Sequence, residues 1–597
     1  MLRNCLFFLL SIIVNLTFSQ ELLIDLSSNP VLHKKQPTFK QSNTILALPF
    51  IDDFSNNSFY PDPILWSSSS VYINRTYPVD PPTFGVATFD GLDATGLAYA
   101  PGTVNIQGNA DTLTSQIIDL STYNNVYFLF YYQPQGIGDR PEIEDSLILE
   151  FKDLDDNWNV VWKVPGDIMY DFRKKTILIN SINYLNANFQ FRFRNKATLS
   201  GNFDHWHIDY IKIDQFSSSS DTSELNDISF VYDSPSFLSR YNEMPWKHFI
   251  NNESIETCDT IDILIRNNQA SINIDYQYNV FENSNIIAHY PTLGITRNAT
   301  VLDYSSIGNF SFSNPPISVS NTVFSSMFPD SVEFNIQHII NTSQNDYKNN
   351  DTLYRSQRFY SHFSYDDGIA EAAYGINVNG AEIAYAFKLN RPDTLRAIQI
   401  YFPHVIDTIN HIPFELVIRD EDSGLPGDTL YTQIVYPFYT EDRIYHTYLL
   451  DIPLRIIGNF FIGVKQTTDD PLNIGLDKNY SANNYMYYNI GSGWLNSQLL
   501  GSWMIRPIVS EKRILSSINN IYNTSLIYPN PASSHIFINT KSRYNELEIY
   551  NIQGVLIRKS RVDELVNRIS LYDIPPGIYI IFLKNSHGKS YHKLVVQ

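Results

Sequence analysis

The stretch Phe189–Asn195 reads FQFRFRN, and its pattern decides the fold. Phenylalanine at positions 189, 191 and 193 alternates with glutamine and arginine. Successive side chains of a β-strand point to opposite faces of the sheet, so the alternation predicts a strand with one buried face. Upstream, VYFLFYY (Val126–Tyr132) has apolar residues at both its odd and its even positions. Both faces of such a strand are apolar, which predicts a strand that is covered on both sides.

The region around these strands, from about Leu46 to Asp214, continues with DSLILEF and closes on FDHWHIDYIKID. It predicts a two-sheet jelly roll. Through its strand pattern and the W-x-I-D motif at Trp206, Ile208 and Asp209, it resembles the MAM-like and concanavalin-type lectin-like domains of secreted bacterial proteins. Because one fold serves many functions, the resemblance implies a fold and no particular activity.

Bulk composition supports a large β-rich protein. The 597 residues are 43% hydrophobic and 17% charged, and 40 Tyr with 37 Phe favour strands over helices. A formal charge of −20 argues against nucleic acid as a partner, because phosphate backbones require dense Lys and Arg.

The N-terminus has the features of a signal peptide covering residues 1–19. Arg3 supplies a positive charge, Leu6–Val14 is an apolar core, and Ser19 precedes a plausible cleavage point. No stretch approaches the roughly 20 apolar residues of a transmembrane helix. Removal of Cys5 with the signal would leave Cys258 without an internal disulfide partner.

Three polar runs divide the remainder. FSSSSDTSE, NTSQNDYKNND and SSINNIYNTS separate regions whose apolar residues recur with period two. Alternating Ile261, Ile263 and Ile265 in the second region resemble an immunoglobulin-like or fibronectin-like spacer. The third region resembles another jelly-roll sandwich. We therefore predict an all-β chain of multidomain β-sandwiches: a jelly roll at 46–215, a spacer at 225–340, a second jelly roll at 356–510 and a small C-terminal sandwich at 526–597.

The C-terminal module begins YPNPASSHIFIN and ends PPGIYIIFLKNSHGKSYHKLVV. Pro529, Asn530 and Pro531 form its first turn, Gly554 suits a hairpin, and Pro576-Gly577 turns the chain into a buried strand, Ile578–Leu583. These ordered motifs closely resemble the type A C-terminal sorting domain of the type IX secretion system. The resemblance implies recognition by the secretion translocon and its sorting machinery, followed by display on the cell surface or release outside a Bacteroidetes-like bacterium.

Acidic loops are the best candidates for metal binding. Asp52 and Asp53 open the first jelly roll, and Asp366 and Asp367 open the third region. Calcium takes six or more oxygen ligands, so these four residues are candidate ligands, with solvated acidic turns as the alternative. His205 and His207, with Asp209, could hold zinc, but the favoured interpretation is an ordinary strand that alternates Trp206, Ile208 and Tyr210 inward against polar outward residues.

Catalytic motifs are weak. Glu142 and Glu144 share a face if their stretch is a strand, as in jelly-roll glycosidases, but the third acid comes only at Glu150. Cys258 with His248 would form a thiol–imidazole pair for nucleophilic catalysis. The stretch ETCDT that contains Cys258 leads directly into a strand, however, which favours an apolar cysteine of a sandwich instead. The Tyr- and Asn-rich stretch Asn479–Trp494 suits either sugar stacking or a sandwich core.

The sequence therefore favours an exported binding or adhesion protein with a carbohydrate or surface ligand, without an assigned catalytic residue and with calcium as the candidate cofactor. Two alternatives stay open: an extracellular hydrolase acting on peptides or glycans, and a structural component of the surface or matrix. A pocket with convergent carboxylates would favour the hydrolase. An open groove with exposed aromatic side chains would favour a lectin.

Overall fold

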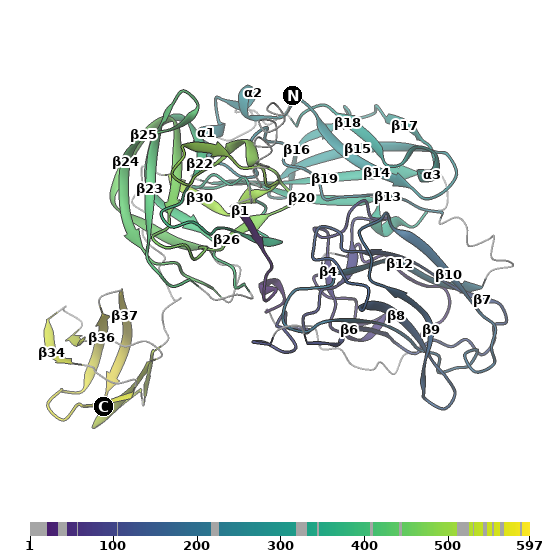
Figure 1. Ribbon diagram of the computed structural model, residues 1–597, viewed down its shortest axis with the longest axis horizontal. Helices are drawn as coiled ribbons and strands as arrows, with labels where there is room; N and C mark the ends of the chain where they lie inside the picture. The colour runs from purple at the N-terminus through teal and green to yellow at the C-terminus, as the bar shows by residue number, and fades with distance from the viewer. Residues whose placement is uncertain are drawn as a thin grey trace, which may run out of the picture. The chain divides into compact units, whose positions relative to one another are not determined.

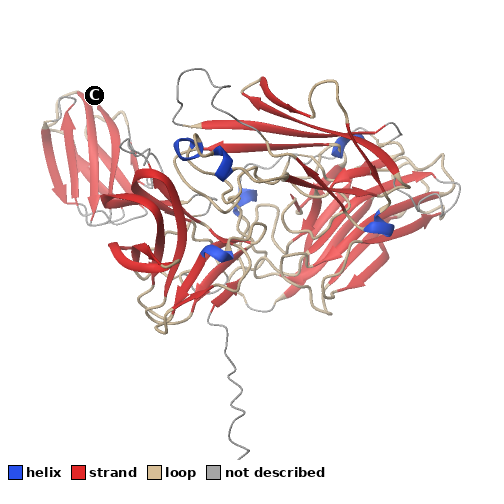
Figure 2. Ribbon diagram, turned by 90° about the horizontal axis from the view of Figure 1, so that it is seen from above, coloured by secondary structure: helices blue, strands red, loops and turns tan. Residues whose placement is uncertain are grey.

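The protein is seen in a computed structural model. It describes residues 21–33, 45–56, 58–103, 106–215, 226–317, 331–342, 346–405, 410–440, 445–509, 525–528, 530–540, 546–551, 555–561, 566–585 and 588–597. Strands dominate these residues, as Figure 2 shows in red, and the predicted all-β class is confirmed. The described α-helices are single turns: α1 (Trp246–Phe249), α2 (Glu253–Glu256) and α3 (Tyr304–Ile307).

The chain forms two compact units, Met1–Glu511 and Lys512–Gln597. The first unit begins with a β-sandwich. One sheet has the strand order β10-β7-β12-β5-β4, with β2 against β12. Its strands are β2 (Phe50–Asp52), β4 (Tyr72–Asn74), β5 (Val86–Phe89), β7 (Val126–Pro134), β10 (Arg173–Ile179) and β12 (Trp206–Gln215). The other sheet has the order β3-β6-β11-β8-β9: β3 (Trp66–Ser69), β6 (Gln107–Ser115), β8 (Ser146–Lys152), β9 (Trp158–Pro165) and β11 (Phe191–Thr198).

Aromatic side chains fill the space between these two sheets. Phe128 of β7 meets Phe191 of β11 edge to face, with 4.7 Å between the ring centroids. Phe191 and Phe193 are fully buried, whereas Arg192 and Arg194 on the opposite face both pair with Glu150 of β8, at 2.6 and 2.9 Å. The period-two prediction for FQFRFRN is confirmed, because one face of β11 packs on the core and the other carries the ion pairs.

The second region of the first unit is also a sandwich of two antiparallel sheets. Tyr276 of one sheet packs against Phe312 of the other at 5.0 Å. Ile261, Ile263 and Ile265 are buried in β14, as the alternation predicts. The strands are β13 (Ile228–Phe230), β14 (Ile261–Asn267) and β18 (Phe310–Asn314) in one sheet, and β15 (Ile272–Glu282), β16 (Asn285–Tyr290), β17 (Arg297–Val301), β19 (Val332–Thr342) and β20 (Thr352–Phe359) in the other.

The third region combines a seven-stranded and a four-stranded sheet, with Tyr385 of β22 against Trp503 of β29 at 5.4 Å. The larger sheet holds β22 (Glu382–Ile400), β23 (Phe414–Asp422), β24 (Leu425–Val435), β25 (His446–Lys465), β27 (Met486–Asn489), β28 (Trp494–Asn496) and β30 (Ile505–Val509). The smaller holds β1 (Glu21–Ile24), β21 (Ala372–Ile376), β26 (Ile474–Asp477) and β29 (Ser502–Trp503). A continuous hydrophobic cluster connects the second and third regions, and it also includes Phe84 of the first sandwich. The predicted boundaries between regions stay predictions.

The second unit contains a three-stranded and a four-stranded sheet around its own core. Ile536 and Ile538 are buried, as their alternation predicts. We expected Ile578–Leu583 to be buried throughout, but only Tyr579, Ile581 and Leu583 face the core; Ile578 is 48% exposed, because only one face of this sheet is covered. The strands are β31 (Ser525–Tyr528), β32 (His535–Thr540) and β35 (Val566–Ser570), and β33 (Glu546–Asn551), β34 (Leu556–Arg561), β36 (Gly577–Asn585) and β37 (Gly588–Val596).

Candidate functional site

The N-terminal segment, Glu21–His33, links the first and third regions. β1 pairs antiparallel with β21, from Glu21 opposite Ile376 to Ile24 opposite Ala373, and Figure 1 shows it in purple among green strands. The buried Glu21 carboxylate accepts hydrogen bonds from Tyr374 Oη at 2.9 Å and from Ser497 Oγ at 2.5 Å. The start of the segment thus completes a sheet made of residues some 350 positions further along.

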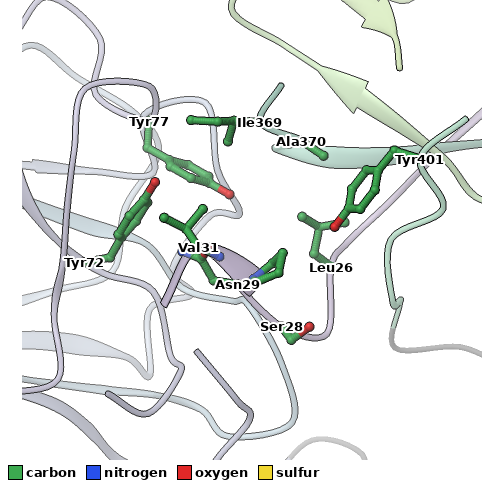
Figure 3. Close-up of a pocket in the computed structure, with 10 residues that line it drawn as sticks. Leu26, Ser28, Asn29, Val31, Tyr72, Tyr77, Ile369, Ala370 and Tyr401 are labelled. Carbon is green, nitrogen blue, oxygen red and sulfur yellow. The ribbon is translucent and has the colours of Figure 1, made fainter. Parts of the chain in front are cut away.

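Beyond β1 the N-terminal segment lies between two regions of the first unit. Figure 3 shows Leu26, Asn29 and Val31 between Tyr72 and Tyr77 of the first sandwich and residues of the third region that include Tyr401. The cavity that they line measures only about 10 Å³, which is room for about one water molecule. This contact fastens the two regions together and leaves no space for an organic ligand.

A larger cavity of about 160 Å³ shares Leu26 with that contact, and we call it the polar pocket. Three regions of the sequence supply its charged and polar groups: Asp25 from the N-terminal segment, Asp139, Arg140 and His205 from the first sandwich, and Glu371 and Lys478 from the third region. Sequence reasoning missed the pocket because these residues share no motif. Only the pairing of β1 with β21 brings them together.

Burial shifts the pKa values of the ionisable groups in the polar pocket. It raises the pKa of Asp139 to about 6 and that of Glu371 well above its usual range. Burial also lowers the pKa of Lys478, although Glu371, Asp25 and Asp139 oppose this shift. Lys478 Nζ donates to the Ile137 carbonyl, and the Lys478 backbone N–H donates to Glu371 Oε2 at 2.9 Å. The pocket therefore places one carboxyl group, that of Asp139, near the protonation balance that proton transfer requires.

The two histidines of DHWHID do not form a metal site with Asp209. His205 Nδ1 accepts the Asp139 backbone N–H at 3.0 Å, while His207 lies 2.9 Å from Thr88 Oγ1 and 3.2 Å from the Gln135 carbonyl. Asp209 accepts the Thr83 N–H at 2.9 Å. Burial lowers both imidazole pKa values, that of His207 to about 4. We expected Trp206, Ile208 and Tyr210 to point inward and the polar residues to point outward. His207 and Asp209 are buried as well, because they contact Thr88 and Thr83 on the second face of β12. Tyr210 does not join Trp206 and Ile208 in the main core but packs with Leu129 in a separate small cluster.

The candidate calcium ligands of the first sandwich lie in its interior. Asp52 accepts Trp66 Nε1 at 2.6 Å and the Phe54 N–H at 3.0 Å, and burial raises its pKa to about 7. Asp53 accepts the Ser55 N–H and hydroxyl through one oxygen and Asn350 Nδ2 through the other. Both carboxylates therefore have protein donors, and their assignment as calcium ligands stays a prediction.

Asp366 and Asp367, the candidate calcium ligands of the third region, lie in different surroundings. Asp366 forms a two-point ion pair with Arg506 and also accepts the Tyr445 hydroxyl. Burial raises the pKa of Asp367 to about 7, and its backbone N–H donates to Asp477 at 2.8 Å. The proposed calcium role of this pair also stays a prediction.

The structure does not bring together the residues of the weak catalytic motifs found in the sequence. Glu142 and Glu144 lie in the turn before β8, so they do not share a strand face. His248 bonds to Asp393 at 3.1 Å and not to Cys258. Cys258 is half-buried, and burial raises the pKa of its thiol to about 11.

A second hollow, of about 260 Å³, opens on the first sandwich, and we call it the aromatic groove. Phe59 and Tyr72 line it together with Asn56, Arg75 and Asp233. Phe59 is 36% exposed, and Arg75 pairs with Asp233 at 2.6 Å, where the Asp233 side chain keeps 46% exposure.

The Tyr- and Asn-rich stretch contributes mainly to packing. Tyr485 stacks on Tyr365 at 5.1 Å and lies against the hydrophobic cluster, and Tyr487 meets Phe461 at 5.7 Å. Trp494 is partly exposed with Arg419 over its ring. These aromatic side chains therefore do not form one open platform.

Asn530 carries the clearest structural role among the predicted sorting residues. Its side-chain Nδ2 donates to the Lys593 carbonyl at 2.6 Å, and its Oδ1 accepts the Val595 N–H at 2.9 Å, which ties the first turn to β37. Pro531 follows in the same turn, Pro576 precedes β36, and Gly577 begins it. Pro529 and Gly554 lie outside the described residues.

Comparison with known proteins identifies the second unit. A family model described as the secretion system C-terminal sorting domain matches residues 526–597. No curated protein matches the chain. Two solved structures resemble parts of it: the K1 cleaved adhesin domain of Lys-gingipain from Porphyromonas gingivalis W83 (11% identity, 33% of this chain and 99% of that chain, TM-score 0.18), and the CBM22-1–CBM22-2 tandem of Paenibacillus barcinonensis Xyn10C (6% identity, 79% and 100%, TM-score 0.17).

The molecule is therefore a multidomain β-sandwich protein that carries an export module. Residues 526–597 are a type IX sorting domain, so the chain is a cargo of the type IX secretion machinery and is delivered to the cell surface or beyond it. Within the described residues, no helix has the length and hydropathy required to span a membrane.

Proposed function

We propose that the exported protein is an extracellular binding or adhesion protein that holds a carbohydrate in the aromatic groove. The observation that carries this proposal is the composition of the groove: an exposed phenyl ring beside an exposed carboxylate. Sugar rings pack their C–H faces on aromatic side chains, and their hydroxyl groups donate to carboxylates. The volume of about 260 Å³ lies just below the usual range of about 300–1,000 Å³ for ligand pockets, which suits one sugar unit of a longer chain.

The position of the sorting domain in a separate unit of the chain is consistent with the same proposal. The sorting domain belongs to a separate compact unit, whereas the groove and the polar pocket both lie in the first unit. We propose further that residues 1–19 are a signal peptide for export to the periplasm. Removal of the sorting domain would then leave the groove intact on a surface-attached or released protein.

The test is binding of the mature protein to a glycan array, with and without a calcium chelator. We expect a defined set of glycans to bind and Phe59→Ala to weaken binding about fivefold, since an aromatic contact contributes about 1 kcal/mol. Tyr354→Ala is the matched control: Tyr354 is 57% exposed but lies outside the groove. Absence of glycan binding in both conditions would overturn the proposal.

The polar pocket favours a second candidate, an extracellular hydrolase. Asp139, with its pKa raised by burial to about 6, and Glu371 are the acid–base pair that we would assign. Turnover of a peptide or glycan substrate by the mature protein, abolished in both Asp139→Asn and Glu371→Gln, would establish this activity. Turnover unchanged in either variant would exclude the polar pocket as its site.

A further inference from the structure

Three acidic side chains outside the polar pocket and the aromatic groove converge at one end of the first sandwich, where two of its strands begin. Glu142 and Asp145 belong to the turn before β8, and Asp204 belongs to the loop before β12. One carboxylate oxygen from each lies within 4.8 Å of the others. Asp145 and Asp204 are each only 1% exposed, whereas Glu142 is exposed. The cluster is therefore mostly buried but open to solvent on the side of Glu142.

Each buried aspartate has one oxygen without a partner. Asp145 Oδ2 accepts the Glu142 N–H at 3.1 Å, and Asp204 Oδ2 accepts the Thr198 N–H at 2.6 Å. The remaining oxygen, Oδ1 of both residues, is buried and has no hydrogen-bond partner. Because a buried polar group without a partner is destabilising, and more so when it is charged, two such oxygens at one place point to a ligand that would pair with them.

Nearby cations compensate the three carboxylates only in part. Arg140, two residues before Glu142, lines the polar pocket. Lys196 lowers the pKa of Asp145 without outweighing burial, and its Nζ donates to the Glu144 carbonyl at 2.9 Å and to Gln107 at 3.2 Å. Burial and the neighbouring carboxylates raise the pKa of Asp145 to about 6 and that of Asp204 to about 8. Three acids this close together require either a bound cation or shared protons.

We propose that Glu142, Asp145 and Asp204 bind a calcium ion. Carboxylate oxygens are the ligands that calcium prefers, and its Ca–O distance of about 2.3–2.6 Å allows opposite ligands to lie about 5 Å apart, which accommodates the observed spacing. The exposed side at Glu142 leaves room for water to complete the coordination. The site is distinct from the aspartates singled out in the sequence.

The ion would join two loops that also form a wall of the polar pocket. The Asp204 N–H donates to Asp139 Oδ2 and the His205 N–H donates to the Asp139 carbonyl, both at 3.1 Å. Asp139 and His205 line the polar pocket. Calcium would therefore fix the position of this wall whether or not the pocket is catalytic.

Calorimetric titration of the chelator-treated mature protein with CaCl₂, together with its thermal midpoint in calcium and in EDTA, tests the proposal. Asp145→Asn and Asp204→Asn retain an oxygen for the observed N–H bonds but lose the charge. We expect each to weaken calcium binding at least tenfold and to reduce the calcium-dependent rise in the thermal midpoint. Glu142→Gln, at an exposed position, provides the same readout if a buried substitution impairs folding.

Glu144→Gln is the matched control, since Glu144 is exposed in the same turn, lies outside the cluster and loses the same charge. We expect it to bind calcium like the unmodified protein. Three results would overturn the proposal: no calcium response up to about 10 mM, a calcium response retained in all three cluster variants, or an equal response to magnesium. A gain of stability in Asp204→Asn that calcium does not affect would instead indicate shared protons.

Discussion

Replacing Arg506 with methionine should destabilise the first unit strongly. Arg506 Nε lies 3.1 Å from Asp366 Oδ2, and the guanidinium makes a second bond to Oδ1. The side-chain exposures are 12% for Arg506 and 0% for Asp366, so methionine leaves a buried carboxylate without its cation. Breaking such a pair costs about 3–5 kcal/mol, which is a change of about 100-fold to several thousand-fold in the folding equilibrium.

Urea unfolding followed by tryptophan fluorescence measures this loss. Lys152→Met is the control, because the Lys152–Asp156 pair is exposed, with 83% exposure at Asp156, and should contribute less than about 1 kcal/mol. A loss in Arg506→Met no larger than that in the control would refute the reasoning.

The pH dependence of the same variant gives an independent check. Burial alone would raise the pKa of Asp366, but Arg506, Tyr445 and Ser364 outweigh it and hold the pKa below its usual value. The stability that this pair contributes is therefore present above about pH 4 and is lost as the pH falls through the folded-state pKa. The deficit of Arg506→Met should be largest at neutral pH and shrink toward pH 3. A deficit independent of pH would contradict this explanation.

Three further predictions concern single positions in the first unit. Glu21→Ala should cost about 1–3 kcal/mol and speed hydrogen exchange in β1, whereas Leu23→Ala, at 47% exposure in the same strand, should change little. Gly96→Ala should lower the thermal midpoint, because Gly96 has φ +77° and an added Cβ would lie 2.1 Å from the Asn29 carbonyl oxygen; an unchanged midpoint would contradict the close approach. Cys258, with its thiol pKa raised by burial to about 11, should react with iodoacetamide at pH 8 on the order of 100-fold more slowly in the folded than in the unfolded protein, and equal rates would disprove its burial.

The sequence was sufficient for the strands and for the sorting domain. Phe191 and Phe193, or Ile536 and Ile538, alternate because each strand buries one face, and this local signal does not depend on distant residues. This alternation did not predict burial correctly where other parts of the chain decide whether the second face of a strand is covered. His207 and Asp209 are polar yet buried, and Ile578 is apolar yet exposed.

Most of the residues of the candidate sites could not be predicted from the sequence. Asp25, Asp139 and Glu371 line one pocket only because β1 crosses to β21. Likewise, Glu142 and Asp145 meet Asp204 because β8 and β12 begin at the same end of the sandwich, although some 60 residues separate them along the chain. Non-local pairing of this kind leaves no periodic signal in the sequence. The aspartate pairs that do stand out in the sequence, Asp52 with Asp53 and Asp366 with Asp367, have protein donors around them instead.

The most direct test of the central claim, export through the C-terminal module, is the cellular location of a chain that lacks Tyr528–Gln597. Because the sorting domain is part of a compact unit of its own, its deletion should leave the first unit folded. Fractionation and immunoblotting of the truncated protein should find it in the periplasm, while the full chain reaches the surface or the medium. Normal surface display or release of the truncated chain would contradict the account.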